Sequence, residues 1–352
     1  MVNFSAIISN NQLSIRASLT SSIDFESEKE SFSIPIQSIK LFSKKNYRIK
    51  LIGLDEEKNI ILNKEYDSDN YGNFEIKRSA ISQKKKIQNI IAYETSQIPG
   101  VDFHMGSFLP LQINNPVKIL ISDFDKTLVD TKYSTPKEMY YSLNRPLNYF
   151  PPITKTIEHI KELIDKGFQP FILSASPHFY ERAIRDWLYQ NQIFASNIYL
   201  KDYRDFISLF DGRLTTKDLK IHGFYKLNKL IDILLMTGIP DELVLFGDGF
   251  ESDPFIYLTL SELLDPKVDP WKLWKSIKNH SFFNLTSKQD SSFITKFYQL
   301  NQMSKNKGEF KLDIYIRTIS DEIDSLKNKV YENKSLNSKN ERVHYYLSER
   351  EK

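Results

Sequence analysis

The stretch VKILISDFDKTLVD, residues 117–130, joins an apolar run to three aspartates within eight positions, Asp123, Asp125 and Asp130. The apolar run has the composition of a buried strand, so the aspartates stand where that strand ends. Carboxylates this close raise one another's pKa and repel, and another interaction must offset that cost. A bound cation is the first candidate.

Length, charge and cysteine content limit the classes of protein that fit the chain. Its 352 residues are more than a single domain usually contains. The 48 Lys and Arg nearly balance the 45 Asp and Glu, and the net charge of +3 gives no reason to expect a nucleic-acid partner. The chain has no Cys, so any metal must be bound by oxygen or imidazole.

The sequence favours a cytoplasmic protein. The N-terminus lacks the charged and apolar regions of a signal peptide, and no segment approaches the roughly 18 uncharged apolar residues of a membrane span. Any membrane contact should therefore be peripheral. On a predicted helix near residue 275, Trp271, Trp274 and Ile277 share one face, which leaves two interpretations open: packing on the domain or lying in a membrane interface.

The hydrophobic pattern changes twice, which predicts three regions. Short alternating segments between residues 30 and 95 predict a β-rich N-terminal domain, a small β-sandwich or meander, at 1–110. From Val117 apolar strands alternate with amphipathic helices, which predicts an α/β domain with a parallel sheet at 111–265. Residues 266–352 are polar, so we expect a helical C-terminal extension with a polar tail.

Four strands alternate with helices in the predicted α/β domain. The helix after the first strand places Ile157 and Ile160 on one face and should end at Gly167. We expect the helix after the second strand to begin with Ser176 as N-cap and Pro177 as its first residue.

Polar residues directly follow three of the predicted strands. They are Asp123, Asp125 and Thr127 after the first strand, Ser174 and Ser176 after the second, and Asp248 and Asp253 after the fourth. Ligands of parallel α/β sheets bind beyond the carboxyl ends of the strands, so these side chains should converge. Carboxylates suit Mg²⁺, hydroxyls suit phosphate oxygens, and an aspartate can attack phosphorus.

In order and spacing these motifs resemble those of the haloacid dehalogenase superfamily, with DFDKT at 123–127, FILS at 171–174, Lys226 and GDGFESD at 247–253. More closely, SASP at 174–177 and GDGFESDPFIY at 247–257 resemble the actin-patch phosphatidate phosphatase family; lipins share this catalytic module more distantly. The resemblance covers about residues 30–265. It implies a Rossmann-like parallel sheet of the haloacid dehalogenase type and Mg²⁺-dependent hydrolysis of a phosphate monoester.

The resemblance also implies a role for each matched residue. Asp123 is expected to be the nucleophile and Asp125 the general acid and base. The residues expected to bind the phosphoryl group are Thr127, Ser174 and Lys226. The expected Mg²⁺ ligands are Asp123, Asp125 through its backbone carbonyl, and Asp248. Asp253 is expected either to bind the ion through water or to orient Lys226.

Other positions depart from the family or have no expected role. Lys126 stands where the family more often has Asp, Gly249 where it commonly has Ser, and Tyr225 where it often has His. These departures leave the phosphatase residues complete but put the lipid substrate in doubt. We expect Asp130 at the surface or in a hinge.

Three functions compete. The first is a Mg²⁺-dependent phosphatase of phosphatidate or a related lipid phosphate; the second is the same chemistry on a soluble phosphate. The short segment at 131–151 cannot form a full cap, which favours an open site for a bulky or membrane-borne substrate. The third is a non-catalytic binding module, against which the intact Asp123 and Asp125 argue.

Overall fold

A computed structural model of the chain describes residues 2–9, 11–19, 46–82, 85–95, 100–113, 117–131, 147–202, 223–283, 285, 287–318 and 342–347. The described residues divide into two compact units, one ending at Ile113 and the other beginning at Val117. Those from 266 onward belong to the second unit, so the C-terminal extension predicted from the sequence is not a separate compact unit.

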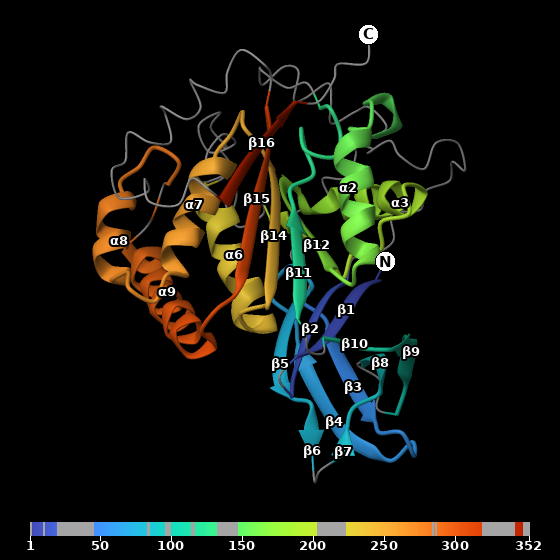
Figure 1. Ribbon diagram of the computed structural model, residues 1–352. Helices are drawn as coiled ribbons and strands as arrows, with labels where there is room; N and C mark the ends of the chain where they lie inside the picture. Colours follow the sequence, from blue (N-terminus) through green and yellow to red (C-terminus); the bar gives the residue numbers. More distant parts are fainter. Residues whose placement is uncertain are drawn as a thin grey trace. The chain divides into compact units, whose positions relative to one another are not determined.

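The first unit is made of short strands. Their bounds are β1 Val2–Ser9, β2 Gln12–Leu19, β3 Arg48–Leu54, β4 Ile60–Asp67, β5 Asn73–Ser79, β6 Ile81–Ser82, β7 Lys85–Lys86, β8 Asn89–Thr95, β9 Asp102–Phe108 and β10 Leu111–Gln112. Two sheets have the orders β10-β1-β2-β5 and β4-β3-β8-β9, and β6 pairs with β7 (Figure 1). Neighbouring strands are antiparallel, except that β10 is parallel to β1.

Alternating side chains of the two four-stranded sheets form one core. Leu13 and Ile15 of β2 and Ile49 and Leu51 of β3 are all buried in the same cluster. This arrangement supports the predicted β-sandwich-like region, although β1 and β2 precede the range in which we expected strands.

The second unit is a six-stranded parallel sheet with helices. Its strands are β11 Lys118–Ser122, β12 Gln169–Pro177, β13 Asn197–Lys201, β14 Glu242–Asp248, β15 Lys311–Thr318 and β16 Val343–Leu347. Its helices are α2 Thr154–Asp165, α3 Glu181–Gln190, α6 Gly223–Thr237, α7 Asp253–Leu263, α8 Pro270–Ile277 and α9 Ser287–Lys307, with the 3₁₀ helices η2 Leu147–Tyr149 and η3 His178–Tyr180. The strand order is β13-β12-β11-β14-β15-β16.

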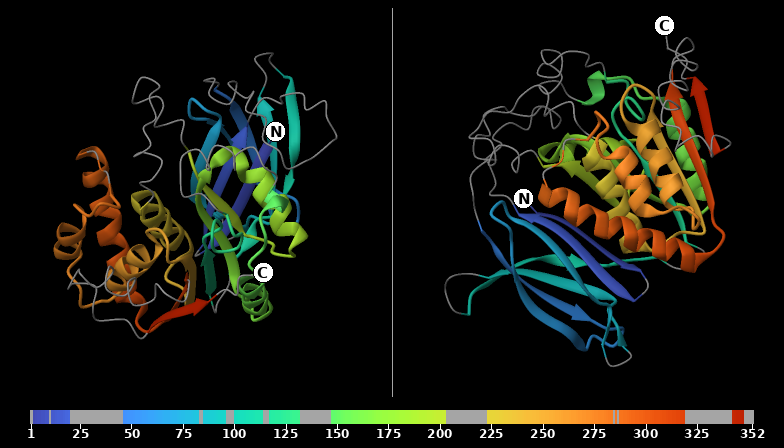
Figure 2. Two further views of the ribbon diagram at one scale, coloured as in Figure 1. Left: turned by 90° about the horizontal axis from the view of Figure 1, so that it is seen from above. Right: turned by 90° about the vertical axis from the view of Figure 1, so that its left-hand side faces the viewer.

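Helices cover both faces of this sheet. Figure 2 shows α2 and α3 on one face and α6, α7 and α9 on the other. Leu120, Ile172 and Val244 share a core cluster with α2 and α3, whereas α6 packs on β12 and α7 on β14 and β15. Strands buried on both faces need near-continuous apolar sequence, as β11 and β14 have.

The strand order reverses at the centre of the sheet. From β11 the chain proceeds to β12 and β13 on one side, and from β14 to β15 and β16 on the other. Such a reversal between two parallel strands opens a crevice at their carboxyl ends, where α/β proteins bind ligands. The residues that follow β11 and β14 therefore occupy this position.

The prediction of a helical C-terminal extension with a polar tail is confirmed for α8 and α9 and is wrong for the strands that follow them. β15 and β16 add two parallel strands to the sheet, and β16 lies within the segment expected to be a polar tail. Leu312, Ile314 and Ile316 alternate in β15 and are buried, and this two-residue period outweighs the polar composition of the region.

Two further expectations need correction. β12 extends to Pro177 and η3 follows, so α3 begins at Glu181 and Ser176 is not its N-cap. In α8, Trp274 and Ile277 are buried as packing residues, whereas Trp271 is 49% exposed and does not share their buried side. Among the described helices, none is both long and apolar enough to cross a membrane.

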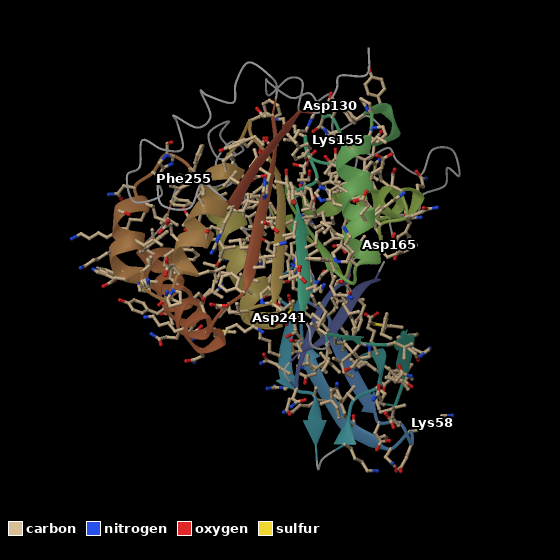
Figure 3. All side chains as sticks on the ribbon, in the orientation of Figure 1. Lys58, Asp130, Lys155, Asp165, Asp241 and Phe255 are labelled. Atoms are coloured by element: carbon tan, nitrogen blue, oxygen red, sulfur yellow. The ribbon has the colours of Figure 1, made fainter. Side chains whose placement is uncertain are left out.

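Asp241 ties three strands of the sheet together at the end opposite the crevice (Figure 3). Its Oδ2 accepts a hydrogen bond from the backbone N–H of Val117 at 2.6 Å, and its Oδ1 accepts one from Lys307 Nζ at 2.5 Å. Its backbone carbonyl accepts from the N–H of Lys311 at 2.9 Å. The hydrogen bonds from Lys307 and Val117 lower the pKa of the Asp241 carboxyl.

We predict that Asp241→Asn lowers the free energy of unfolding at pH 7 by about 1 kcal/mol, since a partly exposed ion pair is lost. A carboxyl whose folded pKa lies below its ordinary value, 3.8, stabilises the fold above that value. The difference between wild type and variant should therefore shrink as the pH falls through the lower folded pKa. Urea unfolding at pH 7 and pH 3 measures it, with exposed Asp165→Asn as control. A difference that persists or grows at pH 3 would contradict the prediction.

Candidate active site

The carboxyl ends of β11 and β14 bring three aspartates together, as the strand order predicts. Asp123 directly follows β11, Asp248 ends β14, and Asp253 begins α7. One carboxylate oxygen from each lies within 4.8 Å of the others, and all three residues are buried. These are the aspartates predicted to surround a cation.

Lys226 of α6 supplies the positive charge inside this cluster. Its Nζ lies 3.1 Å from Asp123 Oδ1 and 2.6 Å from Asp253 Oδ1, and its side chain is 2% exposed. Leu227 and Leu230 of α6 are buried like Lys226, so this part of the helix faces the interior of the domain. A single ammonium therefore pairs with two of the three carboxylates.

Burial and mutual repulsion disturb the pKa values of this cluster. Burial raises the pKa of Asp123 well above its ordinary value, and Lys226 only partly opposes it. Burial, Glu251 and Asp253 likewise raise the pKa of Asp248. Burial alone would lower the pKa of Lys226, but Asp123 and Asp253 outweigh it and raise that pKa. The cluster thus carries more negative charge than Lys226 can neutralise.

The close approach of α7 to β14 requires a glycine at position 247. A Cβ there would lie 2.7 Å from Asp253 Oδ2 and 2.8 Å from Asp253 Cβ, closer than such atoms can approach. Without that Cβ, Asp253 Oδ2 can accept a hydrogen bond from the backbone N–H of Asp248 at 3.3 Å. Gly247 therefore allows the two aspartates to adjoin.

Asp248 leaves one carboxylate oxygen free. Its Oδ1 accepts hydrogen bonds from the backbone N–H groups of Phe250 and Glu251, at 2.7 and 2.9 Å. Its Oδ2 is buried and has no hydrogen-bond partner among the described residues. A buried acceptor without a partner costs free energy, so this atom marks a place where a ligand would be stabilised.

The cluster fits a divalent cation. Asp123, Asp248 and Asp253 each bring one carboxylate oxygen to an all-oxygen set, which Mg²⁺ prefers. Three carboxylates and one ammonium leave an excess of two negative charges, which one divalent ion would neutralise. Asp125, which is expected to bind the ion through its backbone carbonyl, contributes no carboxylate to this group.

Asp125 has its own set of partners beside the cluster. Its Oδ2 accepts hydrogen bonds from Ser174 Oγ at 3.0 Å and from Ser176 Oγ at 2.5 Å. Its Oδ1 accepts one from Thr131 Oγ1 at 3.3 Å. Three hydroxyls therefore fix the carboxylate of Asp125 in a partly buried position.

The structure places the expected phosphate-binding hydroxyls next to the two aspartates of the first motif. Thr127 Oγ1 lies 3.4 Å from Asp123 Oδ2, and Ser174 contacts Asp125. Ser176 was expected at this edge of the sheet but was given no role in the site, and Thr131 was not identified from the sequence. Of the segment expected to flank the substrate, positions 132–146 lie outside the described residues.

The solved structures compared with this chain resemble it only weakly. A calcium-binding mutant of Bacteroides uniformis beta-glucuronidase 2 has 9% identity and a TM-score of 0.25. The match covers 94% of this chain and 35% of the glucuronidase chain. Parabacteroides merdae beta-glucuronidase has 9% identity and a TM-score of 0.26, covering 90% and 34%. The chain spans about a third of the length of these enzymes, and similarities this weak carry no inference. A comparison with curated proteins found no match.

The family comparison is informative. The family described as "Phosphatidate phosphatase APP1, catalytic domain" matches residues 118–270, a range that contains β11 to α7 and all of the clustered residues. This match confirms the family resemblance that the sequence motifs indicated. Residues 118–270 of this chain are therefore similar to the phosphatidate phosphatase APP1 catalytic domain.

Proposed function

We propose that this protein is a Mg²⁺-dependent phosphatase of the haloacid dehalogenase type that hydrolyses phosphatidate or a related lipid phosphate. The observation that carries the proposal is the buried cluster of Asp123, Asp248, Asp253 and Lys226 beside a hydroxyl-bound Asp125. The parallel sheet with its reversal between β11 and β14 supports this fold type.

In the first step, an Oδ atom of Asp123 attacks the phosphorus, and the bond from phosphorus to the alcohol oxygen breaks. Asp125 donates its proton to the departing alkoxide, which leaves as the alcohol. An aspartyl phosphate remains on Asp123. In the second step, Asp125 takes a proton from water, whose oxygen attacks the phosphorus, and inorganic phosphate leaves as Asp123 is regenerated.

The surrounding residues supply charge and orientation. Phosphoryl transfer needs chiefly placement of the groups and neutralisation of charge. Lys226 opposes the negative charge of Asp123 and of the phosphoryl group, while Ser174, Ser176 and Thr131 hold Asp125. A cation held by Asp123, Asp248 and Asp253 would supply further positive charge for the phosphoryl oxygens.

The lipid substrate is supported by the family match and by the short segment between the first two motifs. A site without a large cap suits a bulky substrate, whereas small soluble phosphates usually need a lid. Hydrolysis of a soluble phosphate is the alternative. Peripheral membrane contact, for which exposed Trp271 is a candidate, belongs to the lipid proposal alone.

We predict that Asp123→Asn abolishes phosphate release, with a loss of more than about 10³-fold, because an amide cannot act as the nucleophile. EDTA should abolish wild-type activity, and added Mg²⁺ should restore it. Release of phosphate from p-nitrophenyl phosphate measures both effects, and Asp165→Asn should retain full activity. Wild-type protein that is folded yet inactive on a broad substrate panel would favour a binding module instead.

The same assay should separate lipid from soluble substrates. We expect phosphate release from phosphatidate in mixed micelles to exceed that from sugar and nucleotide phosphates in kcat/KM. Soluble substrates that react faster by orders of magnitude would overturn the lipid assignment but leave the phosphatase chemistry in place.

We predict that Asp248→Asn stabilises the cation-free protein and removes its response to Mg²⁺. The asparagine Oδ1 can keep both backbone hydrogen bonds, while its amide replaces a buried charge that repels Asp253 and Glu251. Thermal unfolding in EDTA should give a higher Tm than wild type by a few degrees. Added Mg²⁺ should raise the wild-type Tm and leave that of the variant unchanged. A lower Tm in EDTA, or a retained Mg²⁺ response, would count against the cation site.

A further inference from the structure

Strand β15 ends beside the acidic end of β14. Asp248 and Arg317 are partners in the parallel ladder, and the backbone N–H of Gly249 donates to the carbonyl of Arg317 at 2.8 Å. Arg317 lies outside the range 118–270 that matches the family. A residue of the C-terminal region thus reaches the predicted cation site.

The guanidinium of Arg317 connects the two loops that carry the aspartates. Its Nη1 donates to the backbone carbonyl of Lys126 at 2.6 Å, and its Nη2 donates to Asp130 Oδ1 at 2.9 Å. Its Cζ lies 6.0 Å from the ring centroid of Phe250 in the other loop. The Arg317 side chain is only 7% exposed. Asp130, labelled in Figure 3, therefore belongs to this contact rather than to a free surface or hinge.

Lys126 extends the connection toward Asp248. Its φ of 58° is left-handed, which costs a residue other than glycine about 1–2 kcal/mol, so its surroundings must hold it there. Arg317 binds its carbonyl, and Lys126 Nζ donates to Glu251 Oε1 at 2.9 Å. The N–H of Glu251 donates to Asp248 Oδ1. An unbroken series of contacts thus leads from Arg317 through both loops to Asp248.

We propose that Arg317 is a positioning residue of the active site: it holds the loop of Asp123 and Asp125 against the loop of Asp248, so that the carboxylates meet in a cation-binding arrangement. The inference rests on the proposed function, which it extends to the C-terminal strands. Arginine suits this role because its planar guanidinium can bind two acceptors at once, which the single ammonium of lysine cannot do with the same geometry.

The test compares Arg317→Met and Arg317→Lys with wild type. Arg317→Met should raise the Mg²⁺ concentration for half-maximal activity and lower kcat, each about 10-fold or more, because partners that orient metal ligands have effects of this size. KM for p-nitrophenyl phosphate should stay within about twofold, since the guanidinium of Arg317 binds Lys126 and Asp130 and is given no role in binding the substrate. Arg317→Lys should recover part of both losses. Calorimetry should show the same order of Mg²⁺ affinities without any turnover.

Lys311→Met is the matched control at the opposite end of β15. The Lys311 ammonium pairs with Asp313 and its side chain is 66% exposed, so the variant should keep the wild-type kcat and Mg²⁺ response. Asp130→Asn should act in the same direction as Arg317→Met but more weakly, and it serves if Arg317→Met does not fold.

The outcomes separate this inference from the proposed function. A lower Tm for the Arg317 variants with unchanged kcat and Mg²⁺ affinity would reduce Arg317 to a structural role and overturn the inference. Wild-type protein that binds Mg²⁺ but hydrolyses nothing would refute the proposed function alone, and the calorimetric comparison would still decide the role of Arg317. Wild-type protein that binds no divalent cation would overturn both.

Discussion

In the site, three buried carboxylates face the single positive charge of Lys226. The other features of the site follow from this excess of negative charge. Its ammonium pairs with Asp123 and Asp253, which leaves Asp248 Oδ2 without a partner among the described residues. Removing ions from water costs several kcal/mol for each ion, so an uncompensated cluster of this kind is unfavourable unless protons or a cation neutralise it. The raised pKa values of the three aspartates express the same imbalance. A divalent cation would neutralise this excess negative charge. The same ion would then both stabilise the folded site and take part in its chemistry.

The parallel sheet makes this concentration of charge possible. The reversal between β11 and β14 brings two strand ends side by side, and Gly247 lets α7 approach β14 closely enough for Asp253 to join them. Asp125 lies beside the cluster but is held by hydroxyls instead of Lys226. Two aspartates two residues apart therefore have different surroundings, as a nucleophile and a proton-transfer group require. The C-terminal strand β15 places Arg317 against the loops that follow β11 and β14.

Much of this could be predicted from the sequence, because local patterns determine it. The helical spacing of Ile157 and Ile160 and the apolar runs of β11 and β14 indicated the elements correctly, and polar residues at strand ends indicated the site. The predictions that were wrong concern features that depend on tertiary contacts. The alternation in β15 was hidden in a polar region, and Ser176 resembled a helix cap before β12 proved to extend through it. Nothing local connects Arg317 with Lys126, since 191 residues separate them and only the pairing of β14 with β15 brings them together.

The central claim is that the acidic ends of β11 and β14 share one divalent cation. Crystals grown with Mn²⁺, which accepts the same oxygen ligands as Mg²⁺ and scatters anomalously, test it most directly. The account predicts a single strong anomalous peak in this unit, within bonding distance of carboxylate oxygens of both Asp123 and Asp248. A peak elsewhere, or none at saturating Mn²⁺ with these carboxylates bound only to protein groups, would contradict it.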